Sequence, residues 1–454
     1  MTRKNALSLD TLIALGAEKL AQVILDEAAD NAAFRKRVNA ALASTKGPEA
    51  VAKLIDRRLA ALERAQAMVD WEKERAFAAD LGATVETIVK ELAPLSPIHA
   101  CQRLLRFIDT HCSVFDRIDD SNGRIQDVYW RAVEAIPGIA RHLPPAELAR
   151  MPERLAISLA KDTHGLARDV AIAMAPLLPQ SVLALWDKML ATGESVGRQD
   201  IRQAIADARG DIDGFLALEA SLPDWQQDPL RAASRLLAAN RLDEALFWVR
   251  RERKGGLGFA RQSDLADGRI NRVHDLDRVQ LEAQILEEKK DRPAAQALRW
   301  SAFETTLNVD ILRDYISKLE DFQEFDEMDR AFAVVAASPL TYTALVFFIA
   351  WPRIDLAAKL VLEKRALWDG RHYDTLGEAA AILDGDYPLA ATVLYRALLK
   401  DILDRGKSPA YGYGARYLAR LGELAQHISE YSDLEDHATY LLGIKKAHGR
   451  KAGF

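Results

Sequence analysis

Apolar residues recur about every three to four positions along most of the chain, which is the spacing of one helix face. Leu12, Leu20 and Ile24 begin this pattern in a helix expected over about residues 8–29. Over residues 49–92 the pattern is almost unbroken and predicts one long helix or two helices meeting near Asp70 and Trp71. The spacing is not strictly heptad, so a packed helical hairpin is favoured over a coiled-coil dimer arm.

A second pattern recurs in the C-terminal half, where a turn-forming residue is followed by a small residue and then a large apolar one. The segments with this order are 240–248, 291–300, 352–360 and 386–395. If Ala295, Met328, Ala357 and Ala390 are the crossing positions, the steps are roughly 30 residues each, the size of one helical hairpin repeat. A small residue lets two helices approach closely. We therefore expect an all-α fold, a right-handed α-solenoid of antiparallel helix hairpins, with a TPR-like C-terminal half.

The first half has shorter helices, separated by proline and glycine at positions such as Pro137-Gly138 and Pro144-Pro145. This rhythm is typical of HEAT-like hairpins. The expected organisation is N-terminal hairpins over 1–95, HEAT-like repeats over 96–229 and TPR-like repeats over 230–454. Residues 250–275 are the only long segment without periodicity, and we expect an exposed loop there.

Composition is that of a globular protein, with 49% hydrophobic and 28% charged residues. The net charge of -6 argues against a general polyanion binder, although it leaves room for a local basic patch. Cys101 and Cys112 would lie roughly 16 Å apart on one helix, too far for a disulfide. We expect a reduced, cytoplasmic protein with no signal peptide, and the apolar run 340–351 is too short to span a membrane.

Three candidate chemical motifs do not meet the requirements of their chemistry. Residues 119–123 resemble a calcium loop, but Ile118 and Tyr129 occupy two positions that need oxygen ligands, so a helix cap is expected. His99, Cys101, His111 and Cys112 match no zinc spacing. The glycine-rich segment 254–258 lacks the ending of a phosphate loop. We therefore predict no catalytic set, no cofactor and no metal.

Basic and aromatic residues supply the candidate contact sites. One interpretation is that these residues contact a nucleic acid or an anionic partner. The other is that the basic segment near residue 250 is a solvated loop and that the last helix seals the end of the solenoid. An enzyme pocket built from His372, Tyr373, Tyr413, Arg416 and His448 is a further alternative. The candidate partner or anion contacts are Arg250, Arg251, Arg253, Lys254, Arg261, Tyr413, Arg416, His448, Arg450 and Lys451.

Six short motifs, in this order, resemble a known family: residues 16–20, 118–123, 344–352, 387–391, 415–418 and 448–454. The chain is similar to an uncharacterised proteobacterial, all-helical domain-of-unknown-function family, itself related to helical regions of SWIM zinc-finger proteins. The resemblance implies a helical fold and supplies no activity. The SWIM zinc motif is not in this sequence, so zinc does not carry over. The family pattern continues past Phe454, which predicts a C-terminal truncation.

The leading functional expectation is a cytoplasmic protein–protein interaction scaffold that is not an enzyme, because stacked hairpins form long binding surfaces. The alternative is a nucleic-acid-binding repeat protein that uses residues 250–261 and 445–451, with binding that weakens steeply with salt. No membrane contact is expected. The sequence specifies neither the partner, the pathway nor the oligomeric state.

Overall fold

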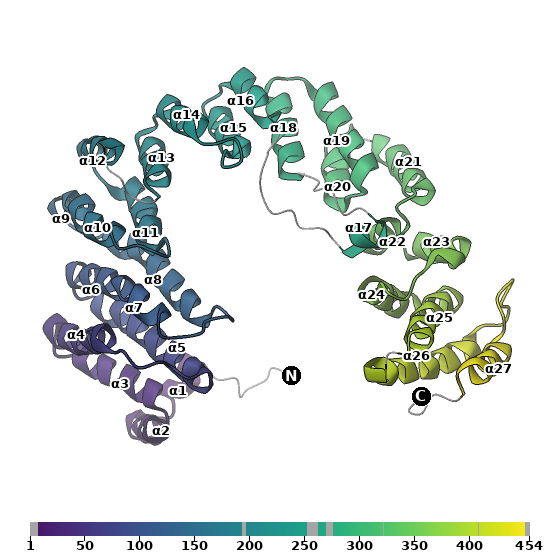
Figure 1. The fold of residues 1–454 in the computed structure, drawn as a ribbon, viewed down its shortest axis with the longest axis horizontal. Helices are drawn as coiled ribbons and strands as arrows, with labels where there is room; N and C mark the ends of the chain where they lie inside the picture. Colours follow the sequence, from purple (N-terminus) through teal and green to yellow (C-terminus); the bar gives the residue numbers. More distant parts are fainter. Residues whose placement is uncertain are drawn as a thin grey trace. The chain divides into compact units, whose positions relative to one another are not determined.

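A computed structural model describes residues 8–192, 197–251, 262–268, 276–320, 322–406 and 408–449 (Figure 1). These residues form helices and connecting turns, and their only β-type pairing is an isolated parallel bridge between Val69 and Ile118. The expected all-α class is therefore confirmed. None of the helices in the described ranges is long and apolar enough to cross a membrane.

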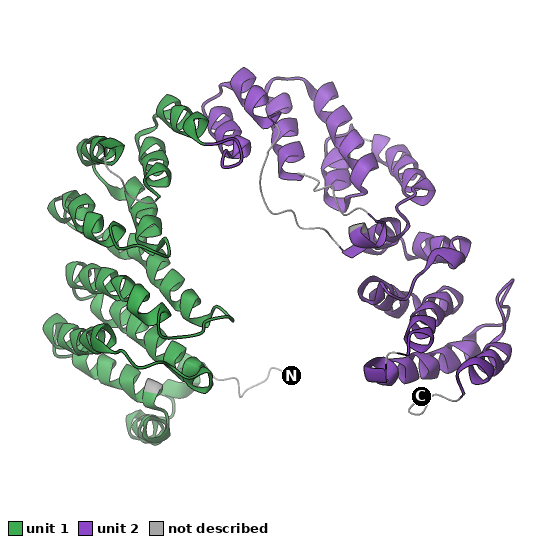
Figure 2. Ribbon diagram, in the orientation of Figure 1, with its two compact units in different colours: residues 1–222 green, residues 223–454 purple. Residues whose placement is uncertain are grey.

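The chain divides into two compact units, residues 1–222 and 223–454 (Figure 2). Three segments had been expected, with boundaries near residues 95 and 229. In the structure, residues 95 and 96 lie between helices of one continuous hydrophobic core, which includes Leu92 and Ala100. This core extends from Val51 to Ile205 and is wholly part of the first unit.

The first unit is built from short and medium-length helices. Its helices are α1 (Leu9–Ile13), α2 (Ala17–Asp30), α3 (Ala32–Ser44), α4 (Pro48–Arg64), α5 (Trp71–Glu86), the π-helix η1 (Thr87–Leu92), α6 (Pro97–Asp109), α7 (His111–Phe115), α8 (Arg124–Ala140), α9 (Pro145–Ala149), α10 (Met151–Leu159), α11 (Leu166–Met174), the 3-10 helix η2 (Ala175–Leu177), α12 (Gln180–Thr192), α13 (Arg198–Arg209) and α14 (Ile212–Ser221).

These helices form two neighbouring rows. In one row α3, α5, α8, α11 and α13 each contact the next. In the other row α4 contacts α6. Further along the chain, α10 packs on α11 and α12 packs on α13, so these contacts join the two rows. Each helix therefore packs mainly on helices close to it in sequence.

The long periodic stretch 49–92 forms α4 and then α5 with its continuation η1, and α4 packs on η1, so the hairpin interpretation is confirmed. Asp70 is the N-cap residue of α5, at the predicted break. The apolar face of α4, which includes Ile55 and Leu59, is fully buried within the unit. A coiled-coil arm would need that face for a partner, so this interpretation is wrong.

The polar turn 119–123 caps α8, as predicted. The Asp120 carboxylate accepts hydrogen bonds from the backbone N–H groups of Ile125 at 2.9 Å and Gln126 at 2.8 Å. Gly123 has a φ of 73°, in the left-handed region that glycine tolerates best. The local sequence chemistry is therefore sufficient to start this helix.

The second unit is also built from short and medium-length helices. Its helices are α15 (Pro229–Ala238), α16 (Leu242–Val249), α17 (Gln262–Ala266), α18 (Leu276–Glu288), α19 (Arg292–Thr306), α20 (Val309–Ser317), α21 (Gln323–Ala337), α22 (Thr341–Ala350), α23 (Ile354–Glu363), the 3-10 helix η3 (Arg365–Leu367), α24 (Tyr373–Leu383), α25 (Pro388–Asp404), the 3-10 helix η4 (Ser408–Ala410), α26 (Tyr411–Leu424), the 3-10 helix η5 (Ala425–His427) and α27 (His437–His448).

The small residues of the recurring motif lie where helices meet. Ala245, Ala295, Ala357 and Ala390 are all essentially buried. The helix pairs α15–α16, α18–α19, α22–α23 and α24–α25 pack on each other around these positions. The close approach that was predicted for the small residues is therefore present.

Residues 262–268 differ from the exposed loop expected over 250–275. They contain the short helix α17, which packs on α22 and α24. The Asp267 carboxylate accepts hydrogen bonds from the backbone N–H groups of Tyr342 at 3.0 Å and Thr343 at 2.9 Å, and so caps α22. The expectation of an exposed loop is wrong for these residues, because a five-residue helix is too short to produce a periodic pattern.

Candidate functional site

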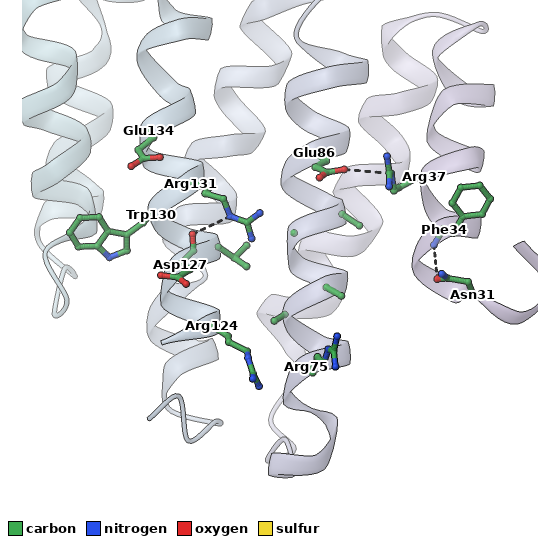
Figure 3. Close-up of a pocket in the computed structure, with 15 residues that line it drawn as sticks. Asn31, Phe34, Arg37, Arg75, Glu86, Arg124, Asp127, Trp130, Arg131 and Glu134 are labelled. Atoms are coloured by element: carbon green, nitrogen blue, oxygen red, sulfur yellow. Dashed lines mark hydrogen bonds and ion pairs between the residues drawn. The ribbon is translucent and has the colours of Figure 1, made fainter. Parts of the chain in front are cut away.

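A groove of about 810 Å³ lies across α3, α5 and α8 of the first unit (Figure 3). Each of the three helices contributes charged or aromatic side chains to it. The groove is lined by Asn31, Phe34, Arg37, Arg75, Ala78, Ala79, Gly82, Ala83, Glu86, Arg124, Asp127, Val128, Trp130, Arg131 and Glu134.

The floor of the groove is one face of α5, where side chains are small. Ala78, Ala79, Gly82 and Ala83 recur at helical spacing on this face, while Leu81 is fully buried in the core. A Cβ atom added to Gly82 would lie 3.6 Å from Nη2 of Arg131, in ordinary contact. The hollow exists because these small residues lie opposite the long side chains of α8.

The arginines of the groove keep most of their hydrogen-bond donors available. Arg131 donates only to a backbone carbonyl of its own helix, the Asp127 oxygen at 3.3 Å, and Arg75 has no partner among the described residues. The Arg37 guanidinium lies 3.5 Å from the Glu86 carboxylate. A guanidinium presents five N–H donors and favours carboxylates and phosphates, so these side chains can bind an anionic group.

Arg124 is positioned by a buried carboxylate behind the groove. Its Nη1 lies 3.6 Å from Oε2 of Glu74, which also accepts a hydrogen bond from Nδ2 of Asn122 at 2.6 Å. The other Glu74 oxygen, Oε1, is buried without a hydrogen-bond partner. Attraction from this buried charge holds Arg124 at the start of α8 while leaving its side chain 54% exposed.

An aromatic side chain lies at the edge of the groove. Trp130 is 49% exposed although it belongs to a helix whose opposite face is buried. Tryptophan and arginine are enriched in the energetically important parts of protein interfaces. The combination of Trp130 with neighbouring arginines is therefore typical of a surface that binds another macromolecule.

This groove was not predicted from the sequence. Its available signals were the small-residue face of α5 and the spacing of Arg124 and Arg131 on one face of α8. Neither signal shows that α3, α5 and α8 lie side by side, because that depends on how the hairpins pack.

The described basic residues near residue 250 take part in contacts within the second unit. Arg250 Nε donates a hydrogen bond to Glu282 Oε1 at 2.7 Å, and that carboxylate is almost completely buried. The Arg251 guanidinium lies 4.5 Å from the centre of the Trp248 ring. Arg250 therefore joins α16 to α18. The remaining members of this predicted set, Arg253, Lys254 and Arg261, lie outside the described residues.

The structure brings together one predicted pair on α26. The Arg416 guanidinium lies 4.3 Å from the centre of the Tyr413 ring, which is 54% exposed. His448 instead faces α25, where its Nε2 lies 3.3 Å from Oδ1 of Asp404. Arg450 and Lys451 lie outside the described residues.

The residues of the suggested enzyme pocket contact different neighbours. The His372 ring lies edge-on to Tyr342, with ring centres 4.9 Å apart. Tyr373 is 59% exposed. His448 pairs with Asp404, as described above. Tyr413 and Arg416 are the only two members that a described contact joins.

One group of described residues has the donor atoms of a metal site. His111, Cys112 and His164 each offer a ligand atom, and these atoms lie within 4.8 Å of one another. His164 was not among the candidates from the sequence. Cys101, which was, is buried, and burial raises the pKa of its thiol to about 11.

The family model described as "Family of unknown function (DUF6880)" matches residues 2–200 and 192–454. The chain therefore belongs to this family. No curated protein and no solved structure matches the chain.

Proposed function

We propose that this chain is an α-solenoid binding protein, and that the groove on α3, α5 and α8 holds an acidic segment of a partner protein. The observation that carries the proposal is the grouping of four arginines and an exposed tryptophan around a floor of small residues. The proposed role is binding without catalysis.

The packing of the helices supports the solenoid part of the proposal. In both units most helices pack on helices that lie a few elements away along the chain, as in α24, α25 and α26, whereas α17 packs on the more distant α22. Repeat proteins are built from such nearest-neighbour contacts and use their extended surfaces for binding. We propose HEAT-like hairpins in the first unit and TPR-like hairpins in the second. A relation to SWIM zinc-finger proteins and a proteobacterial origin rest on the sequence resemblance.

The charges of the groove support an acidic protein segment as the occupant. Arg75 and Arg131 have no carboxylate partner among the described residues, so an incoming Asp or Glu side chain would give them one. Trp130 offers an apolar surface at the edge of the groove for an aliphatic or aromatic side chain. A short peptide can present both kinds of group at once.

Nucleic acid is the less favoured occupant. Glu86, Asp127 and Glu134 also line the groove and would repel a continuous phosphate backbone. In the segments proposed for nucleic-acid binding, Arg250 is already paired with a buried carboxylate. We further propose a cytoplasmic location, which the free state of Cys101 and Cys112 supports.

Peptide selection tests this proposal directly. A random-peptide library would be panned on the full-length protein and counter-selected with the Arg75→Glu/Arg124→Glu variant. We expect enriched peptides rich in Asp and Glu with an apolar residue. Their affinity should fall at least about 100-fold in the double variant, since it loses two charge-assisted contacts, each worth about 1.5–3 kcal/mol.

A matched control distinguishes the loss of groove contacts from a general effect of the protein's net charge on peptide binding. Arg35→Glu/Arg209→Glu changes the net charge equally, at exposed positions that do not line the groove. This control should bind the peptides as well as the unaltered protein does. The proposal would be contradicted if both double variants weakened peptide binding equally. It would also be contradicted if the selected peptides bound equally well without the groove arginines. Displacement of the peptides by a single-stranded RNA would favour the nucleic-acid alternative.

A further inference from the structure

A group of nitrogen and sulfur donors lies at the corner between α6 and α7, away from the groove. His111 and Cys112 start α7, and His164 lies in the turn that precedes α11. Cys112 Sγ lies 3.1 Å from Nε2 of His111. One ligand atom from each of the three residues lies within 4.8 Å of the other two.

The hydrogen bonds of His111 fix which of its nitrogens can bind a ligand. Its Nδ1 lies 2.8 Å from the carbonyl oxygen of Ile108, which can only accept a hydrogen bond. Nδ1 therefore carries the proton, and the lone pair of Nε2 points toward Cys112 Sγ. A backbone carbonyl on the opposite ring nitrogen is the arrangement that orients metal-binding histidines.

The surroundings hold these rings in place. His111 is buried, and its ring lies edge-on to that of His164, with centres 5.3 Å apart. Phe115 also contacts His164, with ring centres 4.9 Å apart. His164 is itself exposed, so an ion can reach the group from solvent.

A carboxylate is available as a further ligand. Asp162 Oδ1 lies 3.6 Å from Nε2 of His111, and its side chain is 5% exposed. Its other oxygen, Oδ2, accepts a hydrogen bond from the backbone N–H of Arg168 at 3.0 Å, near the start of α11. The carboxylate is thus held beside the group by the helix that it caps.

A sulfur and a carboxylate oxygen lie near the ring nitrogen of His111 that carries the lone pair. Asp162 and Cys112 are both beside Nε2, while Nδ1 is bound to the Ile108 carbonyl. The thiol, the carboxylate and the free ring nitrogen are therefore neighbours.

We propose that His111, Cys112 and His164 bind a zinc ion, with Asp162 completing its coordination. Zinc favours tetrahedral sites of imidazole, thiolate and carboxylate ligands, in which donor atoms are about 3.5 Å apart. The ligand atoms of His111, Cys112 and His164, now within 4.8 Å of one another, would move closer by about 1 Å at most to reach this geometry. Calcium and magnesium are excluded as occupants because they require mostly oxygen ligands. The expectation that the protein has no metal is thereby replaced by this proposal.

The bound ion would cross-link α7 to the turn that contains residues 161–165. These segments are far apart along the chain, and the described side-chain contacts between them include weak ones to sulfur, such as Cys112 Sγ to the Lys161 carbonyl oxygen at 3.5 Å. A closed site with four protein ligands serves a structural role. Zinc should therefore raise the thermal stability of the protein.

Cobalt substitution of the full-length protein tests the site. The metal-free protein would be titrated with Co²⁺, and the absorption bands of tetrahedral cobalt and of the thiolate–cobalt bond recorded. Zinc affinity would be measured by competition with a chromophoric chelator. We expect one ion per chain and a thiolate–cobalt band. Zinc affinity should fall at least about 100-fold in Cys112→Ser and in His164→Ala, because changes even to outer-shell partners cost about 10- to 100-fold.

Matched controls separate loss of a ligand from loss of the fold. Cys101→Ala removes the other thiol, and His142→Ala removes another exposed histidine of the same unit. Both should keep the cobalt spectrum and the zinc affinity, and far-ultraviolet circular dichroism should be unchanged in all variants. Asp162→Asn keeps the capping oxygen but should weaken zinc binding. Absence of the thiolate band, or equal zinc affinity in Cys112→Ser, would overturn the proposal.

Discussion

Gly370 lies where the chain passes against α25 with no room for a side chain. A Cβ atom at this position would collide with the carbonyl oxygen of Ala397 and would lie 2.7 Å from Cβ of Asp401. The first of these atoms belongs to the backbone of a helix, so it cannot move aside easily. Gly370 therefore sets how closely the segment before α24 packs on α25.

We expect Gly370→Ala to lower the free energy of unfolding of the second unit by about 1–3 kcal/mol, the usual cost of overpacking. Gly385→Ala is the matched control, because nothing lies within 4 Å of its added Cβ atom. It should leave stability nearly unchanged. Urea unfolding followed by circular dichroism compares the two variants. Equal stability of both variants would show that the close contact does not constrain the fold.

Single residues differ in how far the sequence predicts their roles. The segment 119–123 was expected to cap a helix, and the partners of Asp120 follow it closely in the chain. Asp267 has the same role at the start of α22, but its partners lie 75 and 76 residues away. Local sequence rules cannot identify such a cap, because α17 and α22 must first be packed together.

At the scale of elements, α24, α25 and α26 share one carboxylate. Asp384 Oδ2, at the end of α24, accepts hydrogen bonds from Tyr395 of α25 at 3.1 Å and Arg420 of α26 at 2.8 Å. The Arg420 hydrogen bond lowers the pKa of Asp384 below its ordinary value of 3.8. Burial, together with the neighbouring Asp384, raises the pKa of Tyr395 to about 12, so this hydroxyl remains a hydrogen-bond donor.

A carboxyl group with a lowered pKa in the folded state stabilises the fold above its unfolded-state pKa, and this stabilisation is lost as pH falls through the folded value. We expect Asp384→Asn to cost about 1 kcal/mol near pH 7, since Arg420 is partly exposed. The difference from the unaltered protein should shrink as the pH falls below 3.8. Thermal unfolding at several pH values measures it. Asp386→Ala, at an exposed position nearby, serves as the control. A difference that stays constant with pH would contradict this assignment.

Helices could be predicted from the sequence where the apolar pattern of each helix is sufficient to locate it. The period of the apolar residues located the α4–α5 hairpin and its break at Asp70. The groove needs three helices in register, and the donor group needs His164 from a turn far from Cys112. These sites depend on packing between hairpins, which a periodic pattern does not specify.

At the scale of the whole molecule, the contacts define two units where three segments had been expected. Within the first unit, α4 and η1 pack on α6, and α5 packs on α8. A fragment that ends at residue 95 would lack α6 and α8, and so would expose the apolar faces of all three elements. A fragment that ends at Leu222 keeps the whole core from Val51 to Ile205.

We therefore expect fragment 1–222 to be helical and to unfold cooperatively, and fragment 1–95 to show no cooperative transition. The reason is that burial of apolar surface supplies the stability of a domain, and helix propensity alone is marginal for segments of this length. Circular dichroism during thermal unfolding measures both fragments under the same conditions. Cooperative unfolding of fragment 1–95 would show that the first hairpins form an independent domain, as the sequence pattern had suggested. Failure of fragment 1–222 to fold would mean that its core needs the second unit.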